Sequence, residues 1–134
     1  MPQCSVSWNR TKHTLRGMHY QTAPHAEAKL IRVTRGALYD VALDLRRNSP
    51  TYLRWQAFEL RAGDGRQLYI PEGCAHGFQT LEDDTEVHYM ISTPYHAASA
   101  AGVRFDDPAF GIVWPSAPER ILAPKDLAFP PWTP

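Results

Sequence analysis

The sequence predicts an all-β fold, an antiparallel sandwich, jelly roll or small barrel made of short strands. Hydrophobic and polar residues alternate with a period of two in six runs, and turn-forming residues separate these runs. No segment of ten or more residues carries a helical stripe. Alternation of this kind sends every second side chain to the interior. The six runs are 29–35, 37–45, 52–60, 66–71, 75–81 and 85–92.

Residues that favour turns divide the runs in chain order. Glycine, proline, asparagine and aspartate dominate these breaks because they accept the backbone angles of tight turns. From about residue 94 the sequence becomes rich in proline and alanine, so we expect an irregular segment with at most one helical turn. The length of 134 residues suits a single domain, 1–134. The breaks are Gly36, 48–50, 63–65, 71–73 and 83–84.

Charge and composition exclude several classes of protein. The 14 basic and 14 acidic residues balance, which argues against binding to nucleic acid or to an anionic membrane. No stretch is apolar enough to span a membrane, and the N-terminus does not have the pattern of a signal peptide, so we expect a cytoplasmic protein. Cys4 and Cys74 match no zinc or redox motif.

The stretch LRGMHYQ, residues 15–21, places polar side chains on a strand. In an extended strand His19 and Gln21 share one face, and Arg16 points to the other. Arg16 joins them only if Gly17 forms a bulge or twist. A histidine in such a strand is also compatible with a hydrogen-bonded core residue, so this stretch alone does not establish a site.

The segment 65–78, GRQLYIPEGCAHGF, has the spacing G-x5-P-x-G-x2-H and resembles the second motif of the cupin superfamily of jelly-roll barrels. In that superfamily the histidine, here His76, points into the mouth of the barrel. A plain hairpin turn at 71–73 is the alternative. Many cupins bind a metal through an H-x-H pair in the first motif, but this sequence has only His19 there, and transition metals generally need about three protein ligands. We therefore expect no metal.

A barrel mouth with these residues suits proton transfer at carbon without a metal. Removing a proton beside a ketone requires a base, a positive group for the enolate oxygen and an acid that returns a proton. His19, Lys29 and Tyr89 supply these three residue types. Each has an ordinary structural alternative, namely a core histidine, a solvated edge lysine and a cross-strand aromatic residue.

Across most of its length the sequence resembles the dTDP-4-dehydrorhamnose 3,5-epimerase family, which are metal-free cupins. The resemblance implies a cupin-type antiparallel jelly-roll barrel, no cofactor, a homodimer, and epimerisation at C3, C5 or both of a dTDP-linked 4-keto-6-deoxy sugar. The matching stretches are TLRGMHYQ, AKLIRVTRGALYDVALDLRRNSPTY, RQLYIPEGCAHGFQTLED, TEVHY, GVRFDDPAFGIVWP and APKDLAFPP.

The resemblance also implies roles for individual residues. His19 matches the base, Asp126 the carboxylate that supports it, and Tyr89 the acid. Lys29 matches a lysine beside the keto oxygen. The residues expected to bind substrate are Arg16, Gln21 and His76.

One departure from the family pattern concerns the N-terminus. Family members carry a longer N-terminal segment that reaches the partner subunit, and this sequence begins close to the strand before LRG. Either the protein lacks those contacts or the sequence begins at an internal methionine. If the segment is absent, we expect weaker nucleotide binding and a weaker dimer interface, and one of the two epimerisations could be lost. A single-carbon epimerase with His19 as base is therefore one alternative. A cupin that binds the nucleotide sugar without turnover and a metal-dependent cupin enzyme are the others.

Overall fold

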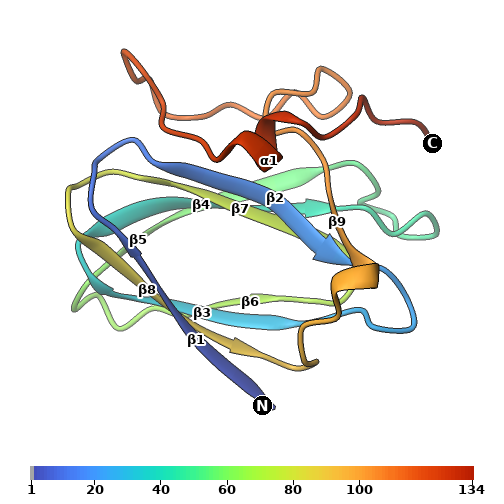
Figure 1. Cartoon of the computed structure of the whole chain (residues 1–134), viewed down its shortest axis with the longest axis horizontal. Helices are drawn as coiled ribbons and strands as arrows, with labels where there is room; N and C mark the ends of the chain where they lie inside the picture. Colours follow the sequence, from blue (N-terminus) through green and yellow to red (C-terminus); the bar gives the residue numbers. More distant parts are fainter. Residues whose placement is uncertain (1) are drawn as a thin grey trace.

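The computed structural model describes residues 2–134 and shows two antiparallel sheets packed face to face (Figure 1). The arrangement confirms the predicted all-β jelly roll of cupin type. One sheet has the order β1 (Gln3–Asn9), β8 (Thr85–Ile91), β3 (Lys29–Arg35), β6 (Leu68–Ile70). The other has the order β5 (Trp55–Arg61), β4 (Ala37–Asp44), β7 (Cys74–Thr80), β2 (Leu15–Gln21), β9 (Ala100–Gly102).

The predicted strands match the observed ones with small shifts. The run 52–60 begins three residues late, at Trp55, because residues 51–53 form a turn. The stretch from about 94 holds more structure than expected. It contains a 3-10 turn (Ala97–Ser99), the short strand β9 and the helical turn α1 (Pro124–Leu127). The Ala-Ala-Gly sequence of β9 has no alternation that could have revealed it.

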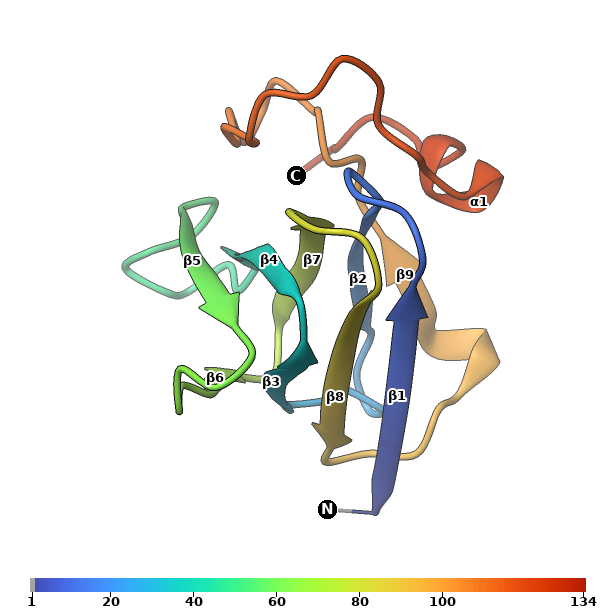
Figure 2. The same ribbon diagram turned by 90° about the vertical axis from the view of Figure 1, so that its left-hand side faces the viewer.

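Two apolar clusters hold the sheets in place. One lies between the sheets and includes Ile31, Leu38 and Phe78, each at most 1% exposed. The other lies on the outer face of the five-stranded sheet, where Met18 and Val41 are covered by the C-terminal segment (Figure 2). Both faces of this sheet are therefore buried, which explains why β7 is buried at every position rather than at alternate ones.

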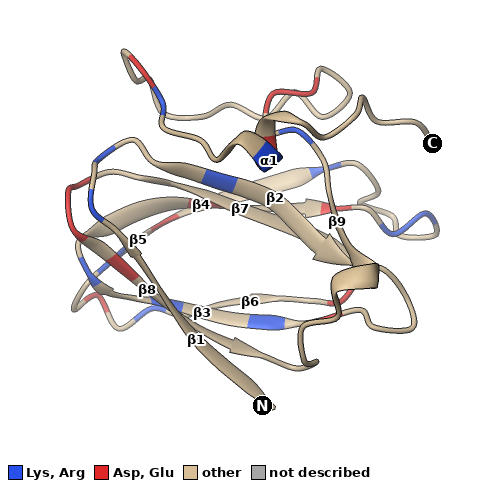
Figure 3. Ribbon diagram, viewed as in Figure 1, with Lys and Arg blue, Asp and Glu red and all other residues tan. Residues whose placement is uncertain are grey.

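Buried polar side chains, among them Gln21, Lys29 and His76, make the interior polar at one end. Strands β2 and β3 belong to different sheets, and both carry basic residues on the strand itself (Figure 3). Most of the other charged residues lie on loops and exposed edges. Among residues 2–134, no helix is both long and apolar enough to cross a membrane.

Candidate active site

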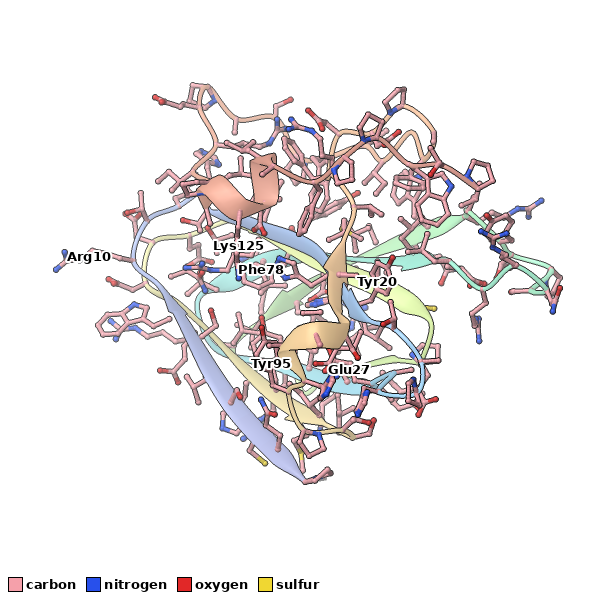
Figure 4. The ribbon with its side chains drawn as sticks, turned by 45° about the vertical axis from the view of Figure 1, so that its right-hand side comes forward. Arg10, Tyr20, Glu27, Phe78, Tyr95 and Lys125 are labelled. Atoms are coloured by element: carbon pink, nitrogen blue, oxygen red, sulfur yellow. The ribbon has the colours of Figure 1, made fainter. Side chains whose placement is uncertain are left out.

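A cavity of about 580 Å³ opens at this polar end, between the two sheets. Its volume is in the range of small-molecule sites. Figure 4 shows Lys125, Tyr95 and Glu27 around the opening and Phe78 deeper between the sheets, whereas Arg10 projects away from the cavity. Six of the seven site residues predicted from the sequence line the cavity. The seventh, Asp126, contacts His19. The six lining residues are Arg16, His19, Gln21, Lys29, His76 and Tyr89.

Gly17 explains how Arg16 and His19 reach the same cavity. The register between β2 and β7 shifts between these two residues, as in a bulge. Gly17 has φ +137°, and a Cβ there would lie 2.6 Å from the Cα of Gly77. Only glycine fits such a conformation and such a close approach. The bulge that Arg16 requires is therefore present, and Met18 packs into the outer cluster.

His19 and Asp126 form a hydrogen-bonded pair. His19 Nε2 lies 2.7 Å from Asp126 Oδ1, and the Gly17 N–H donates to Asp126 Oδ2 at 3.2 Å. Burial alone would raise the pKa of Asp126, which is 1% exposed, but the hydrogen bonds from His19 and Gly17 outweigh it and lower that pKa. An ionised carboxylate can only accept, so Nε2 carries the proton and Nδ1 carries the lone pair.

Tyr89 and Lys29 project into the cavity from the facing sheet. Tyr89 is on β8 and Lys29 on β3, two strands that pair directly. Burial raises the pKa of Tyr89 well above its usual value, and Asp40 acts in the same direction. The phenol therefore keeps its proton at neutral pH. Burial lowers the pKa of Lys29, while Glu27 and Asp40 oppose that change.

His76 sits at the back of the cavity against a buried aspartate. Its Nε2 lies 2.8 Å from Asp40 Oδ1, and both side chains are almost fully buried. The distance is that of a hydrogen bond, but the direction is poor, and within residues 2–134 neither Asp40 oxygen receives a well-directed hydrogen bond. Burial lowers the pKa of His76, although Asp40 pulls it upward. We take the imidazole to be neutral at physiological pH because burial dominates.

Arg16 is held in place by Asn9. The guanidinium Nε donates to Asn9 Oδ1 at 2.7 Å, and Asn9 Nδ2 donates to the carbonyl of Thr85 at 3.2 Å. Asn9 is 1% exposed, so its geometry is fixed by its surroundings. This chain of bonds directs a permanent positive charge along the wall of the cavity.

Gln21 forms part of the wall, and both ends of its amide bond to backbone groups. Its Nε2 donates to the carbonyl of His25 at 2.7 Å, and its Oε1 accepts from the N–H of His96 at 2.8 Å. The side chain thus ties the loop before β3 to the segment after β8. This arrangement supports a role in shaping the site more than direct hydrogen bonding to a ligand.

Several residues at the cavity were not singled out from the sequence, and four of them bear on its chemistry: Asp40 lies behind His76, and Glu27, Tyr95 and Lys125 belong to the lining. The sequence does mark Asp40, because a charged residue in the middle of the alternating run 37–45 is unusual for a buried strand. Glu27 is two residues before Lys29, and Lys125 directly precedes Asp126. Tyr95 lies in the proline-rich and alanine-rich stretch, where no pattern marks it, and it is 67% exposed at the cavity rim.

A metal-dependent cupin, one of the alternatives, requires a cluster of metal ligands in the cavity. Within residues 2–134, no group of three His, Cys, Asp or Glu side chains is arranged to hold a metal ion. His19 and His76 each face an aspartate on a different element, Asp126 on α1 and Asp40 on β4. The two histidines that line the cavity thus belong to two separate His–Asp pairs.

Comparisons with known proteins agree on one family. The family model described as dTDP-4-dehydrorhamnose 3,5-epimerase matches residues 1–133. A dTDP-4-dehydrorhamnose 3,5-epimerase of Sinorhizobium fredii is 49% identical over 117 residues, which is 87% of this chain and 60% of the relative. The chain thus spans about three fifths of the length of that curated relative.

Solved structures show the same fold. A crystal structure of dTDP-4-dehydrorhamnose 3,5-epimerase from Bacillus anthracis with TDP and PPi bound has a TM-score of 0.94 and 42% identity, over 97% of this chain and 74% of that one. A Legionella pneumophila epimerase in complex with dTDP-4-keto-L-rhamnose has a TM-score of 0.90 and 37% identity, over 95% of this chain and 66% of the other.

Proposed function

The chain belongs to the dTDP-4-dehydrorhamnose 3,5-epimerase family, and on that premise we propose that it epimerises C3, C5 or both of a dTDP-linked 4-keto-6-deoxy sugar. The observation that carries the proposal is the placement of His19, paired with Asp126 of α1, on one sheet and of Tyr89 on the facing sheet, with the cavity between them. A base and an acid on opposite sides of a sugar ring are what inversion of a carbon requires.

His19 is the proposed base. With Nε2–H bonded to Asp126, the lone pair on Nδ1 takes the proton from the carbon beside the ketone, and the C–H electron pair moves into an enolate. Asp126 then stabilises the imidazolium that forms. Tyr89 returns a proton to the opposite face of the same carbon, and the ketone forms again. Solvent resets both side chains, so the net reaction is an isomerisation.

Lys29 is the proposed electrophile. The enolate oxygen carries developing negative charge, and a buried ammonium in a low-dielectric site stabilises such a charge far better than water does. His76 lies within the same wall and can contact the sugar through its neutral ring. Loss of Lys29 should therefore lower turnover more than substrate affinity.

The rim of the cavity fits the nucleotide diphosphate. Arg16 and Lys125 both line it, and two cations there suit the two negative charges of a diphosphate. Tyr95 presents an exposed ring at the same rim, a surface on which thymine can stack. These contacts account for binding, while the residues deeper in the cavity account for chemistry.

The decisive experiment is proton exchange in deuterated water. We would incubate the protein with dTDP-4-keto-6-deoxyglucose and follow the C3 and C5 protons by NMR. Loss of both signals indicates a two-carbon epimerase, and loss of one identifies a single-carbon enzyme. Binding of the nucleotide sugar with neither signal lost would support the binding-only alternative instead.

A His19→Ala variant provides the matching control. Removing a general base costs about 10²- to 10⁴-fold in rate, so exchange should fall to the background level. His88, on the outer face of β8, is a histidine outside the cavity lining, and His88→Ala should exchange at the normal rate. Normal exchange in His19→Ala would contradict the assignment of the base.

We also propose that the chain forms a homodimer through the outer face of the four-stranded sheet. This face carries large exposed side chains, with Val6 56%, Trp8 61% and Tyr69 59% exposed. A second copy would remove this apolar surface from water. Sedimentation velocity should show a dimer, and Trp8→Glu should shift it toward monomer. A monomer in the unmodified protein would refute the proposal.

A further inference from the structure

Glu27 lies directly beside Lys29 in the cavity wall. Glu27 Oε1 is 3.4 Å from Lys29 Nζ, and the two side chains are only 11% and 10% exposed. Glu27 belongs to the loop before β3, two residues ahead of Lys29, and both residues line the cavity. The pair is therefore buried at the place where the proposed chemistry occurs.

The backbone around Glu27 is fixed on both sides. The Ala28 N–H donates to Ser92 Oγ at 2.8 Å, and the Ser92 N–H donates to the Ala28 carbonyl at 3.0 Å. Thr93 Oγ1 donates to the carbonyl of Ala26 at 2.9 Å. The loop is thus tied to the chain that follows β8, and the carboxylate of Glu27 is held at a set position rather than on a free loop.

We propose that Glu27 is a positioning residue that holds Lys29 in its ammonium form and aims it into the cavity. The inference rests on the proposed function, since it assigns Lys29 the role of stabilising the enolate. Glu27 acts through Lys29 and not on the substrate. The sequence resemblance assigned Glu27 no role.

The charges around Lys29 explain why it needs such a partner. Arg16 from β2 is a permanent cation in the same cavity, and His19 adds a second positive charge once it accepts a proton. Burial lowers the pKa of Lys29, and Glu27 is the strongest opposing influence, ahead of Asp40 on β4. Without Glu27 the lysine would lose its proton at lower pH, and a neutral amine stabilises an enolate poorly.

The remaining neighbours do not replace Glu27. His76 on β7 has its pKa lowered by burial, and Tyr89 on β8 has its pKa raised, so both are uncharged near neutral pH. Asp126 is bonded to His19 and the Gly17 N–H. Glu27 is therefore the carboxylate best placed to set the charge of Lys29.

The chain contains a matched control pair. Glu59 and Arg61 on β5 are also two residues apart, and their closest atoms are also 3.4 Å apart. Both side chains are about half exposed, however, so solvent screens their interaction. Glu59→Gln removes the same charge as Glu27→Gln, but at the surface and away from the cavity.

The first test measures Lys29 directly and needs no activity. The sequence has only three lysines, Lys12, Lys29 and Lys125, so side-chain lysine signals can be followed by NMR and assigned with single Lys→Arg variants. Glu27→Gln should move the titration of Lys29 to lower pH, and Glu59→Gln should leave it in place. An unchanged Lys29 titration in Glu27→Gln would overturn the inference.

The second test follows solvent exchange into the substrate as a function of pH. In Glu27→Gln the alkaline limb of the kcat profile should move to lower pH, with kcat about 10-fold lower above neutrality and KM changed little. Glu27→Asp keeps the charge and should recover part of the rate. A loss of rate that is equal at all pH values would overturn the inference.

The two tests also separate this inference from the proposed function. If the unmodified protein exchanges no substrate proton, the proposed function fails, and the lysine titration still decides whether Glu27 controls the charge of Lys29. If exchange occurs but the titration and the alkaline limb are unaffected by Glu27→Gln, only the inference fails. Glu27→Asp serves for both tests if Glu27→Gln does not fold.

Discussion

Asp40 and Asp44 are on the same face of one strand, four residues apart, and both are buried, at 0% and 6% exposure. Their surroundings differ completely. Asp44 accepts hydrogen bonds from the backbone and side chain of Arg46, from Ser49 Oγ at 2.5 Å and from Thr51 Oγ1 at 2.6 Å. Within residues 2–134, Asp40 has only the poorly directed contact with His76 at 2.8 Å.

The difference separates a structural carboxylate from one beside the proposed active site. Burial alone would raise the pKa of Asp44, but its hydrogen bonds with Arg46, Ser49 and Thr51 hold that pKa far below the usual range. Such a group stabilises the loop after β4. Asp40 faces titratable groups instead, and its surroundings leave it without a full set of donors. Buried polar groups that are poorly satisfied are frequent at functional sites.

Among variants of these two aspartates and their partners, the largest expected effect comes from Asp40→Asn. Asp40 favours the ammonium form of Lys29 and contacts His76, so its loss should lower the exchange rate about 100-fold, or about 2.7 kcal/mol in the barrier. Stability should change little, because removing a poorly hydrogen-bonded buried charge relieves a desolvation cost. NMR would measure the rate of proton exchange in the substrate, and urea unfolding would measure stability. A large loss of stability with normal substrate exchange would mean that Asp40, like Asp44, has a structural role.

Asp44→Asn should lower stability and leave the proposed catalysis unchanged. The amide cannot accept all the hydrogen bonds that the carboxylate receives, and its NH₂ group would face donors, so we expect a loss of about 2 kcal/mol in the free energy of unfolding. At temperatures where the variant is folded, solvent proton exchange into the substrate should occur at the normal rate, since Asp44 does not line the candidate active-site cavity. A 10-fold loss of exchange in the folded variant would contradict this assignment.

The sequence could not distinguish these two aspartates. In ALYDVALDL both aspartates occupy the same face of the strand. The alternation predicts which residues share that face, but it does not predict which residues of other strands contact them. Asp44 is satisfied by a loop that follows it directly, whereas Asp40 meets His76, which is 36 residues later in the chain. Such long-range partners depend on strand order, which local alternation does not specify.

The fold was more predictable than the site for the same reason. Period-two alternation located the strands, and the motif around His76 indicated the barrel mouth. The pair formed by His19 and Asp126 joins residues 107 positions apart, and only the family resemblance suggested it. Asn9 and Glu27 carried no signal, because their importance lies in which side chain they contact.

The pH dependence of stability should sharpen the contrast. The folded pKa of Asp44 is lowered, so its contribution is fully present above the unfolded value of about 3.9 and is lost as pH falls through the folded pKa. The difference in unfolding free energy between the unmodified protein and Asp44→Asn should therefore be largest above about pH 5 and shrink below about pH 4. Asp126 also has a lowered pKa, but it is present in both proteins and cancels in the difference. A difference that stays constant from neutral to acid pH would contradict the assignment.

The smallest effect concerns the donors to Asp44. Thr51→Ala and Ser49→Ala each remove one hydroxyl bond, and each should cost about 1 kcal/mol in urea unfolding. The two hydroxyls also lie 3.0 Å apart, so they form one network with the carboxylate. Residues in one network do not act independently, and the double variant should lose an amount that differs from the sum by about 0.5 kcal/mol or more. Strict additivity would mean that the carboxylate is held by separate bonds, and the Asp44 loop would then be no more cooperative than an ordinary surface turn.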